Sequence, residues 1–162
     1  MEVYVLVPKK KNILLHACGL ALMITGVLAV ILTAIGFFVF LPVAVVGVLL
    51  GVFLRTRNYE YEYSYFDGDV RFAKIINKSK RKNLKGYGMD DIITIAPIAD
   101  RSVYQYLNNS RLTKKDYTSG NEGANIYVMV AKVSEGIDVI KFEPDEKYLD
   151  AVCMKYRQKV VR

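Results

Sequence analysis

Basic side chains crowd one short segment of the chain, and their type and spacing suit the recognition of anions. The group consists of Lys74, Lys78, Lys80, Arg81, Lys82 and Lys85. Close to a bilayer surface, anionic lipid attracts each such residue by about 1 kcal/mol. We therefore interpret this segment as a candidate contact with anionic lipid. The alternative is a solvated charged loop that binds nothing specific.

The sequence offers little for catalysis or metal binding. Its single histidine, His16, lies in an apolar run, and its two cysteines, Cys18 and Cys153, are far apart in the chain. No phosphate-binding loop, zinc-binding histidine pair, nucleophile elbow or Cys-x-x-Cys motif is present. We expect a protein that is not an enzyme, with no catalytic residues, no metal site and no cofactor.

A long apolar run precedes the basic segment and must position it. Residues 13–54 contain no Asp, Glu, Lys or Arg, while Lys9, Lys10 and Lys11 precede the run and Arg55 and Arg57 follow it. Cytoplasmic flanks of membrane spans carry an excess of Lys and Arg. The pattern predicts a multi-pass protein of the cell membrane with both termini in the cytoplasm.

The apolar run has the length of two membrane spans. A bilayer core about 30 Å thick needs about 20 helical residues, which predicts spans at residues 13–34 and 37–54 with a turn near Gly36. A cleaved signal peptide is the competing interpretation, but the run is too long for one. The predicted organisation is an N-terminal cytoplasmic segment (1–12), a two-helix transmembrane hairpin (13–57) and a cytoplasmic domain (59–162).

Small residues in the second span suggest close helix packing. Gly47 and Gly51 form a small-xxx-small pair, which lets helix backbones approach in lipid. In an antiparallel hairpin they would lie level with Gly19 and Ala21 of the first span. We expect contact within the hairpin, and a homodimer through this face is the alternative.

After Arg57 the sequence alternates strictly. Tyr59, Tyr61, Tyr63 and Tyr65 are separated by Glu60, Glu62 and Ser64. This is the period of a half-buried strand, and Asp67-Gly68 is a strong hairpin signal, so residues 70–77 form the returning strand. An eight-residue strand travels about 26 Å and its partner comes back, which predicts that a loop at residues 78–85 lies near the bilayer.

The tyrosine row has two interpretations. Its rings either form an aromatic platform at the membrane interface or cover the inner face of the sheet, and we favour the second because Tyr has a high strand propensity. Stacking on nucleic acid is not expected, because Glu60 and Glu62 interrupt the row. Residues 59–162 also contain only 18 basic against 15 acidic residues.

The rest of the chain predicts more strands and one helix. Strands are expected at residues 91–98, 101–107, 126–133 and 137–142, with a polar loop at residues 108–125. A helix is expected to begin with Pro144 in its first turn and to bury a stripe of Leu149, Val152, Cys153, Tyr156 and Val160. The predicted fold class is α+β: a transmembrane helical hairpin, then a mostly antiparallel sheet or open barrel with one C-terminal amphipathic helix. For residues 1–8 two interpretations remain: they add a strand to the sheet, or they lie along the membrane interface.

The chain resembles bacterial pleckstrin-homology-like domains that follow transmembrane hairpins. The matching features include Tyr61-Glu62-Tyr63, the Asp67-Gly68 turn and residues 89–95. More narrowly, it resembles a family of small two-span bacterial membrane proteins of uncharacterised function, through its opening residues 1–4, residues 116–120 and residues 142–147. The resemblance implies the fold. Lipid-binding eukaryotic members usually carry a basic loop between their first two strands, and Asp67-Gly68-Asp69, taken as that loop, is acidic.

Two functions follow as hypotheses. The first is a non-enzymatic membrane-anchored module that presents a small cytoplasmic β-rich domain to anionic lipid of the inner leaflet or to a protein partner. The second is a small accessory subunit of a membrane transporter or envelope enzyme complex. No nucleic-acid partner is expected.

Overall fold

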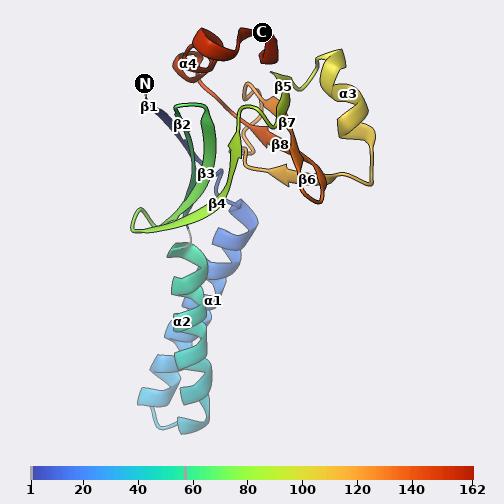
Figure 1. Cartoon of the computed structure of the whole chain (residues 1–162). Coiled ribbons are helices and arrows are strands. Elements are labelled where there is room, and N and C mark those ends of the chain that lie inside the picture. Colours follow the sequence, from blue (N-terminus) through green and yellow to red (C-terminus); the bar gives the residue numbers. More distant parts are fainter. Residues whose placement is uncertain (1, 57) are drawn as a thin grey trace. The chain divides into compact units, whose positions relative to one another are not determined.

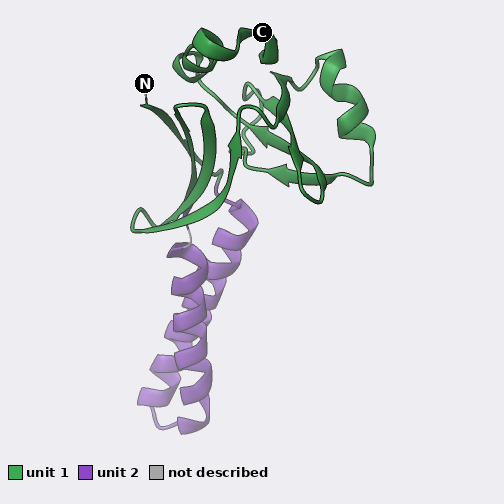
Figure 2. Ribbon diagram, in the orientation of Figure 1, with its two compact units in different colours: residues 1–10, 59–162 green, residues 11–58 purple. Residues whose placement is uncertain are grey.

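The chain forms two compact units in the computed structural model, which describes residues 2–56 and 58–162. One unit contains Met1–Lys10 together with Tyr59–Arg162, and the other contains Lys11–Asn58 (Figure 2). Arg57, predicted as part of the basic flank, and Met1 lie outside the described residues. The first unit is therefore built from two stretches of sequence that the second unit separates.

The second unit is a helical hairpin. Helix α1 (Ile13–Ala34) has the predicted bounds, and α2 (Leu41–Thr56) follows a short 3-10 turn, η1 (Phe38–Phe40). Asn12 caps α1, because its side-chain oxygen accepts a hydrogen bond from the backbone N–H of Leu14 at 3.0 Å. Gly36 turns the chain with φ = 112°, a conformation that favours glycine.

Both helices are long and apolar enough to cross a membrane. The candidate spans are Ile13–Ala34 and Phe38–Thr56, and only 17% of the most apolar stretch of each is buried within the structure. Helices that present apolar side chains outward in this way suit a lipid environment.

Glycines let the two helices approach closely. A Cβ added at Gly47 would lie 3.0 Å from Gly26 Cα, and one at Gly51 would lie 2.8 Å from the carbonyl oxygen of Gly19. Gly47 and Gly51 thus pack against α1 inside the hairpin. The facing residues are Gly26 and Gly19, so the predicted neighbour Ala21 is replaced by Gly26.

The other unit begins with a four-stranded antiparallel sheet, here called sheet A. Its order is β1 (Glu2–Pro8), β2 (Tyr59–Phe66), β3 (Asp69–Ile76) and β4 (Lys80–Gly88) (Figure 1). Residues 2–8 therefore add a strand to the sheet. The connection between the first two strands is the whole hairpin segment, so the identification of Asp67-Gly68-Asp69 as that loop was wrong.

Strand β4 corrects a second expectation, because residues 80–85 were predicted as loop. Asn77 and Lys78 have φ of 51° and 56°, and Ser79 N donates to the carbonyl oxygen of Ile76 at 3.1 Å. Two positive φ values in a tight turn are the geometry that joins twisted strands into a hairpin. The strand forms at an edge of the sheet, where its ladder bonds do not require an apolar pattern.

A second four-stranded sheet, sheet B, has the order β5-β7-β8-β6. Its strands are β5 (Ile92–Pro97), β7 (Tyr127–Val133), β8 (Gly136–Phe142) and β6 (Thr113–Asp116). The hairpin of β7 and β8 was predicted. Strand β6, which pairs in parallel with β8, lies in the segment predicted as polar loop, because its TKKD sequence carries no apolar signal.

Residues 101–108 form a helix, α3 (Arg101–Asn108), so the strand predicted there was wrong. Asp100 is the N-cap and accepts from the backbone N–H of Ser102 at 2.8 Å. Val103, Tyr106 and Leu107 are spaced by three and four residues and pack against the outer face of sheet B. The cap and this spacing favour a helix over the predicted strand.

The C-terminal helix α4 (Glu146–Tyr156) begins after Asp145, which caps it through the backbone N–H of Tyr148 at 2.8 Å. Pro144 therefore precedes the cap and does not lie in the first turn as predicted. After α4 the chain makes a 3-10 turn, η2 (Arg157–Lys159), and runs beside β5, where Val161 N donates to the carbonyl oxygen of Ile95 at 2.8 Å.

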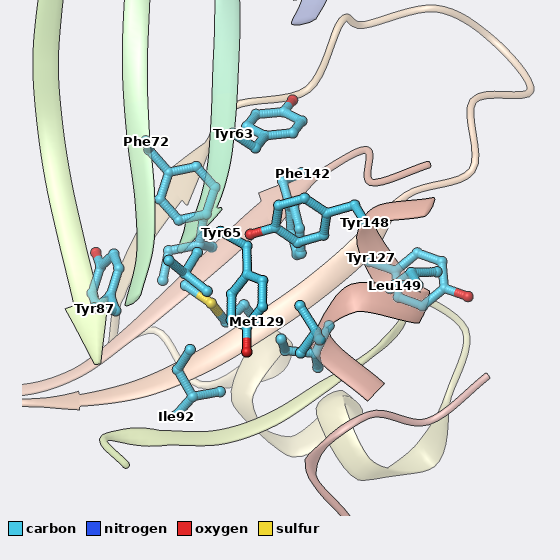
Figure 3. Packing of buried hydrophobic residues seen from close by; sticks show 14 of the residues in the cluster. Tyr63, Tyr65, Phe72, Tyr87, Ile92, Tyr127, Met129, Phe142, Tyr148 and Leu149 are labelled. Carbon is cyan, nitrogen blue, oxygen red and sulfur yellow. The ribbon is translucent and has the colours of Figure 1, made fainter. Parts of the chain in front are cut away.

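The core between the two sheets is largely aromatic, and α4 contributes to it. Figure 3 shows Tyr63 and Phe72 of sheet A near Phe142 of sheet B and Tyr148 of α4. The rings meet edge to face, with centroids 5.6 Å apart for Tyr63 and Phe142, an arrangement that aromatic pairs prefer. The tyrosine row thus covers the inner face of its sheet, with Tyr61, Tyr63 and Tyr65 buried.

Candidate functional site

One end of sheet A is the point at which the chain leaves for the helices and returns from them. The last residues of β1 and the first of β2 meet there, since Pro8 pairs with Glu60 and Lys9 N donates to the carbonyl oxygen of Tyr59 at 3.1 Å. The turn between β3 and β4 lies at this same end, because Tyr59 is opposite Ile76. We call it the open end of sheet A.

The open end carries most of the basic residues predicted as a site, and a bulge decides which way they face. Phe72 is opposite Lys85, but Ala73 is opposite Asn83, so β4 has one extra residue at Leu84. Because a bulge shifts the alternation of a strand, Lys80, Lys82 and Lys85 all share the inner face, toward sheet B.

Two lysines of the open end are directly opposite each other in sheet A. Lys74 of β3 is the register partner of Lys82 of β4, and Lys80 follows two residues away on the same face. Like charges directly opposite in a sheet are destabilising. Lys74 Nζ also lies 3.6 Å from the centroid of the Tyr59 ring, a cation–π contact that stabilises this ammonium group.

Lys78, Lys80 and Lys82 differ from Arg81 and Lys85 in their surroundings. All three are exposed, and no salt bridge to any of them occurs within residues 2–56 and 58–162. Lys78 is held in the turn with positive φ. The open end thus presents three unpaired cations beside Lys74.

The remaining two predicted residues have partners elsewhere. Arg81 lies on the opposite face of β4 and forms an ion pair with Glu62. Lys85 reaches across to sheet B, where its Nζ lies 3.0 Å from Asp138 Oδ2. The structure therefore divides the predicted cluster, and Arg81 and Lys85 contact groups away from the other four residues.

Asp138 is the residue that sequence reasoning missed. It is 3% exposed, and its Oδ2 accepts hydrogen bonds from Lys115 Nζ at 2.6 Å, Tyr87 OH at 2.8 Å and Lys85 Nζ at 3.0 Å. These groups come from β4, β6 and β8, so the cluster ties the two sheets together. The sequence did carry a signal, because Asp138 lies among the apolar residues of β8. A charged residue that is buried in a strand is almost always paired, so a partner could have been expected.

Electrostatics explain why this carboxylate stays ionised. Desolvation by itself would raise the pKa of Asp138, but the hydrogen bonds from Lys115, Lys85 and Tyr87 outweigh it and lower the pKa below the usual value. Burial, and then the hydrogen bond to Asp138, raise the pKa of Tyr87. Tyr87 therefore remains a neutral donor beside a charged acceptor.

A segment near the open end binds the two residues that follow β1. Asp116 Oδ1 accepts from the backbone N–H of Thr118 at 2.9 Å, which shapes a tight turn. The carbonyl oxygens of Thr118 and Ser119 then accept from Lys9 Nζ at 3.0 Å and Lys10 N at 2.8 Å. The motif at residues 116–120 thus has a structural role, since it holds the end of β1.

No arrangement for metal binding occurs among the described residues. Within residues 2–56 and 58–162, His, Cys, Asp and Glu side chains do not gather in groups of three that could hold a metal ion. His16 and Cys18 lie on α1, and Cys153 lies on α4. The chemistry that the geometry supports is the binding of anions by ammonium groups.

Two sheets, a capping C-terminal helix and a strand order that begins with a four-stranded meander agree with the fold expected from the resemblance. The chain belongs to the family described as bacterial PH-like domain (DUF6106). The family model matches residues 1–162. No curated protein and no solved structure matched the chain. Membership supports a small, non-catalytic β-rich PH-like domain.

Proposed function

We propose that this protein is a membrane-anchored, non-enzymatic module whose PH-like domain contacts anionic lipid through the open end of sheet A. The observation that carries the proposal is the gathering of Lys78, Lys80 and Lys82 at the open end, exposed and without a salt bridge among the described residues. An anion at this surface would be attracted by all three charges.

The course of the chain supports a location near the bilayer. Lys9 and Tyr59, at the open end, are each only a few residues from an apolar helix in the sequence. A few residues of extended chain span at most about 3.5 Å each. The lysines of the β3–β4 turn lie at this end of the sheet, which supports the proposed contact with lipid head groups.

The proposed orientation places the domain and both termini in the cytoplasm. Lys9, Lys10 and Lys11 precede α1, and Arg55 lies in the last turn of α2. Such basic flanks stay on the cytoplasmic side. The inner leaflet is the anionic one. The proposed surface and the lipid that it would meet are then on the same side.

The test compares lipids with the full chain in nanodiscs. We expect amide hydrogens of the β3–β4 turn to exchange more slowly in discs that contain phosphatidylglycerol than in discs of phosphatidylcholine alone. The double variant Lys80→Gln, Lys82→Gln removes two charges, each worth about 1 kcal/mol at the surface, and should abolish most of the difference. The double variant Lys132→Gln, Lys147→Gln, at exposed lysines of β7 and α4, removes the same number of charges and is the matched control.

Equal exchange in the two lipids would contradict lipid contact. A difference that the control variant removes as fully as Lys80→Gln, Lys82→Gln would show attraction to the net charge of the domain, without a role for the open end. The accessory-subunit hypothesis stays a separate prediction, and it expects a stoichiometric larger partner when the protein is purified in mild detergent.

A further inference from the structure

A cavity of about 310 Å³ adjoins the Asp138 cluster, on the side of the turn between β7 and β8. Its wall includes Lys85 from sheet A, Lys115 and Asp138 from sheet B, Arg111 from the segment before β6, and Glu135 from the turn. Small-molecule sites usually measure about 300–1,000 Å³. The cavity is large enough for a small ligand and distinct from the open end.

The cations of the cavity wall outnumber the carboxylates. Lys85 and Lys115 share a single oxygen of Asp138, so one carboxylate faces two ammonium groups. Arg111 is exposed, and its guanidinium has no ion pair within residues 2–56 and 58–162. Even with Glu135 ionised, the wall keeps a surplus of positive charge.

Hydrogen-bond donors also remain available. An ammonium group has three hydrogens. Lys115 Nζ uses two, on Asp138 and on Tyr87 OH at 3.1 Å, and Lys85 Nζ uses one, on Asp138. The buried carboxylate fixes both lysines in place, which reduces the entropy lost when they bind a further acceptor.

We propose that this cavity binds a small anion that carries a phosphoryl group, with Lys85, Lys115 and Arg111 as its ligands. Lysine contacts phosphate as a point charge, and the planar guanidinium fork of Arg matches two of its oxygens. The anion neutralises the surplus charge beside Asp138. This site goes beyond the proposed lipid contact and uses different residues from the open end, Lys74, Lys78, Lys80 and Lys82.

The test measures thermal unfolding of the full chain in uncharged detergent. Inorganic phosphate at about ten times its Kd should raise the midpoint by about 5 °C over chloride at equal ionic strength. Arg111→Ala should remove most of the rise, and this exposed side chain can be changed without disturbing Asp138. Lys114→Ala, the neighbour that does not line the cavity, should keep it, as should Lys82→Ala at the open end.

A second experiment, in nanodiscs, distinguishes a lipid head group from a soluble ligand as the source of the phosphoryl group. A rise with phosphatidic acid that Arg111→Ala abolishes identifies a lipid head group, whereas a rise with inorganic phosphate alone identifies a soluble ligand. No rise in either arm overturns the proposal, and so does a rise that Arg111→Ala leaves intact. Because Lys82→Ala weakens only the open end, failure of this site and failure of the lipid contact are distinguishable.

Discussion

The backbone N–H of Lys9 donates to the carbonyl oxygen of Tyr59 at 3.1 Å, although both helices of the hairpin separate these residues in the sequence. The bond extends the antiparallel ladder of β1 and β2 to the point where the chain departs for α1. The hairpin is thus an insertion between two adjacent strands of the PH-like domain. Removing it should leave the ladder intact.

We predict that replacing residues 10–58 with Asn-Gly gives a soluble, folded domain. Lys9 and Tyr59 already have the spacing of a hydrogen-bonded pair that flanks a two-residue turn, and Asn-Gly favours that turn. Circular dichroism and gel filtration should show a monomer with cooperative unfolding. A monomer without cooperative unfolding would contradict the prediction.

A chain that begins at Tyr59 is the informative comparison, because it lacks β1. It exposes core residues that pack against Val3, Val5 and Val7, and burial of one such side chain contributes about 1.5–3 kcal/mol. We expect it to be less stable than the Asn-Gly variant by at least about 3 kcal/mol, measured by urea unfolding. Equal stability would show that β1 is dispensable.

The sequence predicts those elements whose apolar pattern is clear. Residues 13–34 contain no Asp, Glu, Lys or Arg, which predicts a span, and the Tyr59–Phe66 strand alternates strictly. The β4 strand, KRKNLKGYG, shows neither pattern. Its strand state comes from the ladder with β3 and from the turn at Asn77 and Lys78, which are long-range and conformational causes that periodicity does not report.

The candidate site was only partly predictable for the same reason. The basic residues are evident in the sequence, but the bulge at Leu84 decides which of them share a face. The pairing of Lys85 with Asp138 joins residues 53 positions apart. A carboxylate in an apolar strand indicates that partners are needed once it is buried, but only the packing of the two sheets identifies those partners.

Removing the hydroxyl group from either of two core tyrosines should change the stability of the protein in opposite directions. Tyr148 OH is buried and has no hydrogen-bond partner among the described residues, whereas Tyr63 OH donates to the carbonyl oxygen of Tyr117. Tyr148→Phe removes an unsatisfied group and should stabilise the protein by up to about 1 kcal/mol, while Tyr63→Phe should destabilise it by about 1 kcal/mol. Urea unfolding measures both, and equal losses would indicate a partner for Tyr148 such as a buried water.

Asp138→Asn should destabilise the domain by about 1–3 kcal/mol, because it leaves two ammonium groups without their carboxylate. The effect stays moderate because the Lys85 side chain is 41% exposed, so solvent screens its share. Glu135→Gln, at the exposed turn, is the control and should change stability by less than about 0.5 kcal/mol. Similar losses in the two variants would contradict a special role for Asp138.

The lowered pKa of Asp138 also predicts how stability depends on pH. A carboxyl group whose pKa is lower in the folded state stabilises the protein above its unfolded pKa of about 3.9. That contribution is lost as the pH falls below this value and through the folded pKa. In the Asn-Gly variant, adding Asp138→Asn should therefore flatten the dependence of unfolding free energy on pH below about 4, and an unchanged slope would contradict the assignment.

Substitution at Gly51 tests the packing of the hairpin. An added Cβ would lie 2.8 Å from the carbonyl oxygen of Gly19 and 2.9 Å from Met23 N, so Gly51→Leu must push the helices apart, at a cost of about 1–3 kcal/mol. Val45→Leu enlarges a side chain that is 51% exposed and should have little effect. Unfolding of the full chain in mixed micelles, monitored by circular dichroism of the helices, measures the difference. If both variants unfold alike, the close approach of α1 and α2 does not stabilise the hairpin, and the glycine face is free to form a homodimer.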